Sequence, residues 1–178
     1  NTASSMLQMK LLQTLPELLI TPLSSLELSL SFIIGGTVRG FVNGILILLI
    51  CIMVGMEIRD PVSTVFIIFV VAWSFSSLGL FIGQMSDSWD QLSLIQNFVL
   101  TPLSFLGGIF YSVTMLPEWG LAISKVNPVF YTINSLRYAT LGASDAPFAS
   151  SMVFIVLFSL LLTTLAVKTM ESGKKIRF

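Results

Sequence analysis

Histidine is absent from this 178-residue chain, and Cys51 is its only cysteine. A single cysteine excludes a disulfide within the chain, and a metal site built from histidine and cysteine lacks its ligands. Charged residues are also scarce, at 10% of the chain, whereas soluble domains carry about 25%. Because basic and acidic residues balance at nine each, net charge gives no argument for a nucleic-acid partner. We therefore expect no metal site and no nucleic acid.

Apolar residues are abundant in this chain, in contrast to charged residues. They make up 54% of the chain, and the mean hydropathy is +0.92. A helix that spans a bilayer needs about 20 mainly apolar residues. The sequence predicts an all-α membrane helix bundle, one transmembrane domain over residues 1–178, that is polytopic with about four spans. The predicted spans are residues 33–56, 62–83, 92–113 and 150–167.

Residues 114–148 are too polar to span a bilayer alone. Asn127 is a favourable N-cap, Pro128 a favourable first helical residue, and Gly142 a favourable helix terminator. The pattern predicts a broken hairpin of two short helices, partly re-entrant, with other parts of the protein shielding its backbone from lipid.

Basic residues indicate the orientation of the spans. Cytoplasmic segments next to spans are enriched in lysine and arginine. The tail, residues 168–178, has four such residues, so we expect it and residues 1–24 on the cytoplasmic side, with 114–148 outside. The four basic residues of the tail are Lys168, Lys174, Lys175 and Arg177.

The N-terminal segment contains two patterns typical of helix starts. Thr14 precedes Glu17 by three residues, and Ser24 precedes Glu27 by three. Each pair fits a capping box, in which a hydroxyl and a carboxylate accept backbone N–H groups. We expect a short interfacial helix near residues 15–20, and then a long helix from about residue 25 into the first span.

Three glycines at four-residue spacing lie in the first span. Gly36, Gly40 and Gly44 would share one helix face, where another backbone can approach closely. We expect this face to pack against a helix of the same subunit. Arg39 is expected near the cytoplasmic end of the span, where its long side chain could reach the interface.

The third span contains residues that soluble helices avoid. Pro102 removes a backbone donor, and Gly107 and Gly108 add backbone freedom. Within a membrane bundle, neighbouring hydroxyls and helices can satisfy the freed backbone groups. The sequence predicts a kink at Pro102 and a loose or closely packed outer half of the span.

The order "TPLSFLGGIFYSVTMLPEW…VNPVFYTINSLRYATLG" resembles the signature region of type-2 ABC exporter permeases. Upstream, "LPELLITPLSSLELSLSFIIGG" is similar to the coupling helix and following span of this family. Within this family, the sequence looks most similar to bacterial inner-membrane permeases of the drug-resistance, nodulation-factor and uncharacterised-export subgroup. Members have six spans, so the resemblance implies that the first two spans precede these residues.

The resemblance implies a permease subunit that moves a hydrophobic or amphipathic substrate out across the bacterial inner membrane. Two permease copies, a homodimer in the full-length protein, would pair with two ABC ATPase subunits, which bind ATP and Mg²⁺. No G-x-x-x-x-G-K-[ST] phosphate loop occurs in the chain, which agrees with a separate ATPase chain. The residues expected to contact the ATPase are Gln13, Leu15, Glu17 and Leu18, and those of a kinked outer gate are Pro102, Gly107, Gly108, Asn127, Pro128 and Arg137.

Two functions other than that of an ABC permease subunit are possible for a membrane helix bundle. A secondary transporter or channel would normally carry acids inside its spans, and the predicted span cores carry none. An intramembrane enzyme would need an activated nucleophile or a metal, and no histidine is present to activate a serine. We therefore expect no catalytic residue. The candidates for an enzyme would be Ser74, Ser76, Ser77, Asp87 and Asp90.

Overall fold

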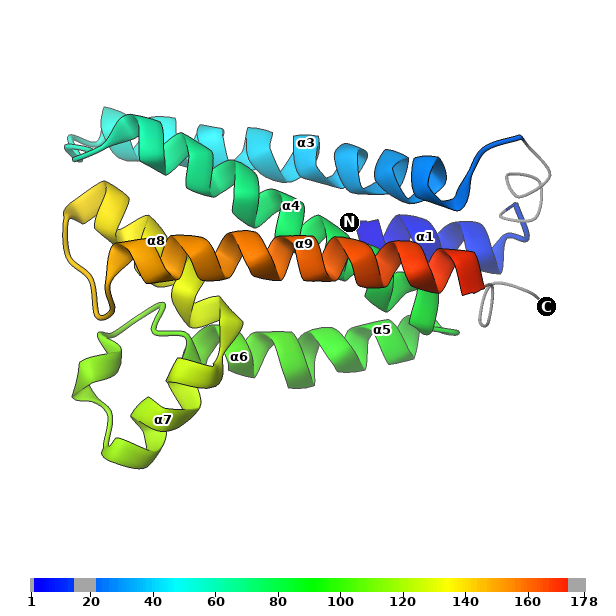
Figure 1. The fold of residues 1–178 in the computed structure, drawn as a ribbon. Coiled ribbons are helices and arrows are strands. Elements are labelled where there is room, and N and C mark those ends of the chain that lie inside the picture. The colour runs from blue at the N-terminus through cyan, green and yellow to red at the C-terminus, as the bar shows by residue number, and fades with distance from the viewer. Residues whose placement is uncertain (1, 15–21, 173–178) are drawn as a thin grey trace.

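The structure, a computed structural model, describes residues 2–14 and 22–172 (Figure 1). Within these residues every regular element is helical, which confirms the predicted all-α membrane bundle. The elements in order are α1 (Thr2–Leu11), α3 (Ser25–Met53), α4 (Pro61–Met85), α5 (Trp89–Ile95), the π-helical η1 (Gln96–Leu100), α6 (Thr101–Leu106), the 3₁₀ turn η2 (Val113–Met115), α7 (Glu118–Val126), α8 (Pro128–Leu141) and α9 (Phe148–Ser172).

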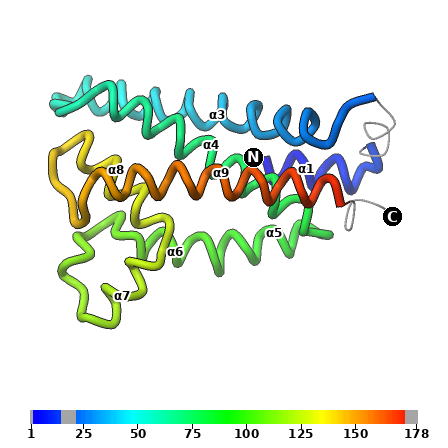
Figure 2. The backbone as a smooth tube through the Cα atoms, viewed as in Figure 1, coloured from blue at the N-terminus to red at the C-terminus, as the bar shows by residue number. Residues whose placement is uncertain are grey.

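The long helices run along one axis, and α4 is central to their packing. It contacts α3, α9, α1 and α8, with α1 against its second half. Helices α6, α7 and α8 lie toward one end of the bundle, and Figure 2 shows α7 on the opposite side of the molecule from α3. We call the end with α7 and the second half of α8 the Arg137 end, and the end where α1, α4 and α9 terminate the Lys10 end.

Three helices of the described residues are long and apolar enough to cross a membrane: α3, α4 and α9. The predicted third span, residues 92–113, is instead divided among α5, η1 and α6, a helical run of 18 residues that ends at Leu106. The predicted end at residue 113 is wrong, because Gly108 has φ +84° and turns the chain out of the helix.

Local capping explains two helix starts that the sequence predicted. The Ser24 hydroxyl accepts the Glu27 N–H, and the Glu27 carboxylate accepts the Ser24 N–H, so the capping box at the start of α3 is confirmed. The Asn127 side chain accepts the Val129 N–H at 3.0 Å and begins α8. Gly142, with φ +77°, ends α8 as predicted.

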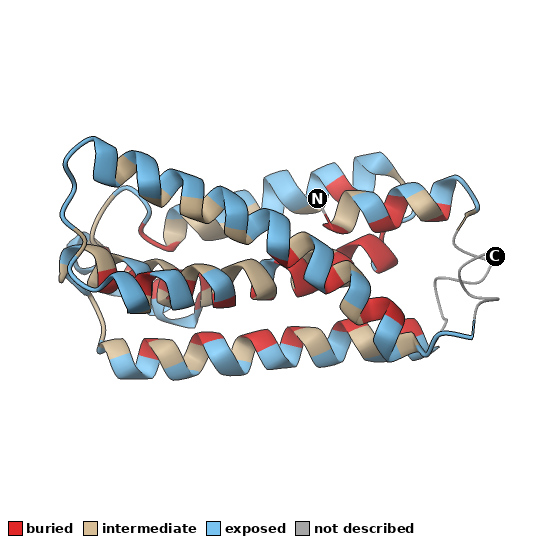
Figure 3. Cartoon of the chain, turned by 90° about the horizontal axis from the view of Figure 1, so that it is seen from above, coloured by how far each residue is buried: buried red, intermediate tan, exposed pale blue. Residues whose placement is uncertain are grey.

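The core is a thin seam rather than a globular centre. Buried apolar side chains lie where α4 meets its neighbours, and Figure 3 shows exposed residues along the outward faces of the long helices. Those outward faces are apolar, which suits a hydrocarbon solvent. The largest buried cluster joins α1, α3, α4 and α9 at the Lys10 end and consists of Met6, Leu28, Ile33, Leu80, Ala166 and Met170.

Candidate functional site

The candidate site is the helical cap at the Arg137 end, which begins where the α5–α6 run is irregular. Pro102 cannot donate a backbone hydrogen bond, and its ring crowds the carbonyl one turn earlier. The turn just before it is π-helical, and both the N–H and the hydroxyl of Thr101 donate to the Gln96 carbonyl. The Ser104 hydroxyl donates to the Leu100 carbonyl at 2.8 Å. A wider turn and two hydroxyls thus accommodate the proline.

The two glycines form the corner between α6 and the cap. A Cβ on Gly107 would lie 3.0 Å from Ile133 Cδ1 of α8, so the corner packs closely against that helix. Gly108 has a left-handed backbone, which glycine adopts without steric cost. This conformation aims the Gly108 carbonyl at Arg137, which donates to it through Nη2.

Arg137 forms the centre of a clasp that holds the cap together. Its Nη1 lies 2.9 Å from Asp145 Oδ2, and its Nη2 also donates to the Tyr111 carbonyl at 3.4 Å. The Asp145 carboxylate accepts the Ser112 hydroxyl and the Val113 N–H, the latter at 2.9 Å. We call Arg137, Asp145 and these partners, with Gly108, the arginine clasp. It joins α8, the loop before α9 and the segment after α6.

The charge on Asp145 persists in this setting. Burial alone would raise the pKa of Asp145, but hydrogen bonds from Ser112 and Val113 and the charge of Arg137 outweigh it and lower the pKa below its ordinary value. A lowered pKa stabilises the fold at pH values above the ordinary pKa of an aspartate. The contribution is lost as the pH falls through the lowered value, so the clasp stays charged at neutral pH.

Two asparagines complete the cap. The Asn134 amide nitrogen donates to the Ala146 carbonyl at 3.0 Å and to the Ser151 hydroxyl at 2.9 Å. Its oxygen accepts the N–H groups of Asp145 and Ala146, so a buried amide uses both ends to fix the loop. Asn127 begins α8 and also donates to the Leu103 carbonyl at 2.5 Å, which ties α8 to α6.

The turn between α3 and α4 is attached to the end of α8. The backbone N–H groups of Arg59 and Asp60 donate to the Thr140 and Ala139 carbonyls at 3.0 and 2.9 Å. The Arg59 guanidinium lies 5.0 Å from the centre of the Tyr138 ring, close enough for a cation–π contact. The last carbonyls of α8 are therefore satisfied by the turn that connects two spanning helices.

At the opposite end, a buried lysine joins α1 to the end of α4. Lys10 Nζ donates to the Asp87 carboxylate at 2.6 Å and to the carbonyls of Ser86 and Gln84 at 3.0 and 3.4 Å. Lys10 is buried, whereas the Asp87 side chain is 56% exposed. Neither residue was expected to pair from the sequence, because they lie 77 positions apart.

We predict an asymmetric response at this pair. Lys10→Met leaves two buried carbonyls without their donor and should lower the free energy of unfolding by about 2–3 kcal/mol. Asp87→Asn leaves the lysine with both carbonyls and removes an ion pair that is open to water, which should cost less than about 1 kcal/mol. Thermal unfolding of the purified variants measures both. Equal losses of unfolding free energy in the two variants would contradict the view that Lys10 stabilises the fold mainly through the two carbonyls.

Of the residues expected to contact an ATPase, only Gln13 lies within the described residues. Leu15, Glu17 and Leu18 lie outside them, as does the helix predicted near 15–20. Gln13 has φ +57° and follows the end of α1. Its N–H donates to the Lys10 carbonyl, and the Thr14 N–H donates to the Met9 carbonyl, the two bonds of a Schellman motif.

The three glycines at four-residue spacing face α4. Gly40 is closest to Ala72, since a Cβ on Gly40 would lie 3.2 Å from the Ala72 Cβ. A Cβ on Gly36 would overlap the hydroxyls of Thr2 and Ser76, and one on Gly44 would overlap Ile68. The backbones of α3 and α4 therefore approach each other along this face.

The three serines considered as enzyme candidates form hydrogen bonds within α4 or to neighbouring helices. Ser76 donates to the Ile33 carbonyl at 2.8 Å, and Ser74 donates to the Val70 carbonyl at 2.8 Å. Ser77 bonds the Thr163 hydroxyl at 3.0 Å. Across residues 2–14 and 22–172, no three His, Cys, Asp or Glu side chains gather closely enough to hold a metal ion. The three serine hydroxyls therefore take part in contacts within and between the helices.

Comparison with known proteins decides the family. The family model described as ABC-2 type transporter matches residues 1–141. The chain belongs to the ABC-2 type transporter family. The ABC-2 chain is 33% identical to the inner membrane transport permease YadH of Escherichia coli K12 over 178 residues, which is 99% of this chain and 70% of the relative.

Two further relatives of the ABC-2 chain are nodulation proteins J. That of Rhizobium leguminosarum bv. viciae is 30% identical over 76 residues, 43% of this chain and 29% of the relative. That of Sinorhizobium fredii is 24% identical over 95 residues, 53% of this chain and 36% of the relative. No solved structure matches the chain. The match to a permease family confirms the resemblance read from the sequence.

Sequence reasoning missed Asp145 and the double role of Asn134. Arg137 is the residue that the sequence favours, because a guanidinium near the outer boundary can bind a row of carbonyls or a lipid phosphate. Asp145 lies in a polar loop, where an aspartate is ordinary, and its contacts to residues 112 and 113 cross more than 30 positions. The one signal that could have pointed to Asp145 is that the charge of Arg137 favours a nearby anion.

Proposed function

We propose that this chain is the membrane subunit of an ATP-driven ABC exporter that moves a hydrophobic or amphipathic substrate out of the cell. The observation that carries the proposal is the family match over residues 1–141, which includes the whole cap up to the end of α8. The similarity to an inner membrane transport permease supports a multi-pass subunit of the bacterial inner membrane.

The proposed motor is a separate ABC ATPase that binds ATP and Mg²⁺. Membership of the ABC-2 family implies pairing with such a subunit. The chain itself has no phosphate loop, which agrees with ATP binding by a separate subunit. A second permease copy would complete the transporter, as a homodimer in the full-length protein.

In the proposed orientation the Lys10 end faces the cytoplasm and the Arg137 end faces outward. The basic residues of the tail support this assignment, because Lys168 lies in the last two turns of α9 and the other three follow the end of α9, which is at the Lys10 end. The segment expected to meet the ATPase then follows α1 directly. The cap held by the arginine clasp would cover the outer end of the pathway.

The proposed mechanism transmits motion along the bundle. Closure of two ATPases around ATP would push the segment after α1, and the Lys10 contact would pass that displacement to α4. Because α4 packs against α3, α9 and α8, its displacement reaches the cap. Opening of the cap would require the clasp to exchange partners, since its carbonyl and carboxylate groups must stay satisfied.

Crosslinking tests the ATPase contact. Single cysteines at Gln13, Leu15, Glu17 and Leu18 in a Cys51→Ala background should crosslink to the copurified ATPase, and the yield should change with the nucleotide. Cysteine at Met115 is the matched control, because that residue is exposed at the Arg137 end and should give no product.

Absence of a crosslink in every nucleotide state would refute the predicted contact. Transport that continues without ATP, driven by an ion gradient, would refute the ATP-driven exporter and favour a secondary transporter. Both experiments need the full-length permease together with the ATPase, because the match to YadH covers 70% of that relative.

A further inference from the structure

An apolar groove lies between α3, α4 and α8, toward the Arg137 end. It has a volume of about 440 Å³. Its floor is the close contact of α3 with α4 at Gly40 and Gly44, and α8 lines it with Ile133. The hydroxyls of two lining residues, Ser104 and Thr132, donate to backbone carbonyls of their own helical runs at 2.8 and 2.7 Å. Because these donors are already used, the groove favours an apolar occupant.

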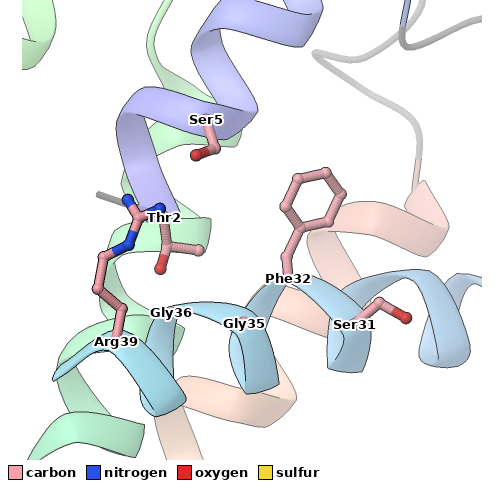
Figure 4. A pocket seen from close by; sticks show the side chains of 7 residues that line it. All are labelled: Thr2, Ser5, Ser31, Phe32, Gly35, Gly36 and Arg39. Carbon is pink, nitrogen blue, oxygen red and sulfur yellow. The ribbon is translucent and has the colours of Figure 1, made fainter. Parts of the chain in front are cut away.

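The start of α1 lies in line with this groove. Figure 4 shows Thr2 of α1 beside Gly36 of α3, and a Cβ on Gly36 would overlap the Thr2 hydroxyl. The same hydroxyl bonds Ser76 of α4 at 2.9 Å. At Gly36 the face between α3 and α4 is therefore covered by α1. One turn farther along α3, at Gly40, the groove begins.

The register between α1 and α4 is constant. Thr2 bonds Ser76, and each of these residues is 74 positions from the other. Lys10 bonds the Gln84 carbonyl at 3.4 Å, again across 74 positions. The two helices therefore run parallel and side by side. Followed from Leu11 back to Thr2, α1 points along α4 toward the Arg137 end (Figure 1).

The contacts between α3 and α4 extend this register into the groove. Ala72 of α4 is the residue nearest to a Cβ on Gly40. One turn farther along, Ile68 is the residue nearest to a Cβ on Gly44. A helix that extended α1 in the N-terminal direction with the same offset of 74 would place its residue four before Thr2 beside Ala72, and its residue eight before Thr2 beside Ile68. About ten helical residues, or about 15 Å, would therefore pass through the groove.

We propose that the segment directly preceding residue 1 in the full-length permease extends α1 as a helix and fills this groove with apolar side chains. The alignment with YadH covers 70% of that relative, and the resemblance to six-span permeases implies that further chain precedes these residues. A segment of this chain is favoured over a lipid or a second copy, because α1 already covers the same face in the register that leads into the groove.

The proposed helix would connect the two ends of the bundle as one rod. Its first turns would contact Ile133 of α8 in the cap. Its last turns are α1, which leads into the segment expected to contact the ATPase. This consequence rests on the proposed function. Displacement of that segment would then reach the cap along a single helix, in addition to the route through Lys10 and α4.

Cysteine pairs in the full-length permease test where the segment lies. In a Cys51→Ala background, Ile68→Cys is combined with one cysteine at each of the four positions seven to ten residues before Thr2, which together make one helical turn. After oxidation in membranes, the pairs that face each other should give at least about fivefold more disulfide than the others, because the Cα atoms of a disulfide lie within about 7 Å. Phe66→Cys with the same four partners is the matched control, since two residues are about 200° around a helix and Phe66 is half exposed.

Ile133→Cys repeats the test from α8, with the second cysteine scanned over the ten positions before Thr2. Disulfides that form within one chain and recur at helical spacing support the proposal. A product with twice the mass of the chain would place a second copy in the groove. Absence of a product with both Ile68→Cys and Ile133→Cys would leave the groove to lipid or substrate. Either of these last two results overturns the proposal.

Ser4→Pro tests whether the helix continues before Thr2. If α1 began at Thr2, the Ser4 N–H would have no acceptor within the helix, and a proline in this first turn would change stability little. If the helix continues, the Ser4 N–H bonds a carbonyl four residues earlier, and the proline should lower the thermal unfolding midpoint of the full-length permease by at least about 5 °C. Ser4→Ala is the control and should leave the midpoint unchanged. Equal midpoints for Ser4→Pro and Ser4→Ala overturn the continuous helix.

Spin labels at Met53 and Met115 test the rod in the permease–ATPase complex. Both residues are exposed, Met53 at the end of α3 and Met115 in the 3₁₀ turn of the cap. Trapping with ATP and vanadate should change the distance between the labels in the parent complex but not in Ser4→Pro, although both hydrolyse ATP. An equal change in both refutes the rod, as does a parent complex that hydrolyses ATP without any change in this distance.

Failure of the proposed function gives a different result. A parent complex that does not hydrolyse ATP would refute the ATP-driven exporter. The disulfides and the unfolding midpoint of Ser4→Pro would still decide where the segment lies.

Discussion

Arg137→Ala is expected to lower transport at least about tenfold in an assembled complex whose basal ATP hydrolysis persists. The guanidinium contacts two backbone carbonyls and Asp145, and its side chain is only 19% exposed. Its removal leaves a largely buried carboxylate without its counter-charge, which costs about 3 kcal/mol in such settings. Because about 1.4 kcal/mol changes an equilibrium tenfold, the closed cap should lose most of its population. Transport into inverted vesicles and ATP hydrolysis by the purified complex measure the two activities.

Two further variants separate a clasp from an interfacial anchor. Arg137→Lys keeps the charge but loses the fork that reaches Gly108 and Asp145 together, so transport should stay low. Asp145→Asn should behave like Arg137→Ala, and the double variant should add little, because both changes break the same contact. If every variant transports like the parent, Arg137 serves only as an anchor at the membrane surface.

Gly40→Leu should prevent stable packing of α3 on α4. A Cβ at this position would lie 3.2 Å from the Ala72 Cβ, closer than almost all real Cβ contacts, so α4 would have to move away to admit a leucine. The expected loss of folding stability is about 3 kcal/mol or more, at the upper end of the range for overpacked sites. The yield of folded permease in detergent, measured by size-exclusion chromatography, reports the effect.

Gly35→Leu is the matched control, since the same side chain would enter open space five residues earlier on the same helix. Its folded yield should equal that of the parent. If Gly40→Leu also assembles and exports normally, the face that carries Gly36, Gly40 and Gly44 does not need the close approach to α4.

The sequence was sufficient where the information is local. Capping at Ser24 and at Asn127, and the left-handed end at Gly142, depend on neighbours within a few positions, so the starts of α3 and α8 and the end of α8 were predictable. Hydrophobic length alone identified three spanning helices. The family resemblance rested on short motifs that include the same capping and turn residues, such as Asn127 and Gly142. The match to the family model confirmed that resemblance.

Long-range pairing and the shape of the third span were not predictable. Arg39 was expected near the cytoplasmic end of its span, and it lies at the middle of α3, a helix that begins at Ser25 as predicted. The π-helical turn before Pro102 was expected only as a kink, since the choice between a bend and a wider turn depends on which hydroxyls reach the free carbonyls. Lys10 and Asp145 found partners that sequence spacing does not reveal.

The attachment of the α3–α4 turn to the end of α8 restricts how the outer end of the bundle can move. Two backbone hydrogen bonds and the Arg59–Tyr138 contact join one edge of the cap to the turn between α3 and α4, two helices that pack against each other. The opposite edge, at Gly107 and Gly108, is held by the arginine clasp, whose side-chain contacts can exchange partners. In the proposed transport cycle we therefore expect the cap to rotate about the α8 edge. Such a rotation would open the bundle beside α6, and the proposed amphiphilic substrate would then leave sideways toward the outer leaflet rather than straight into water.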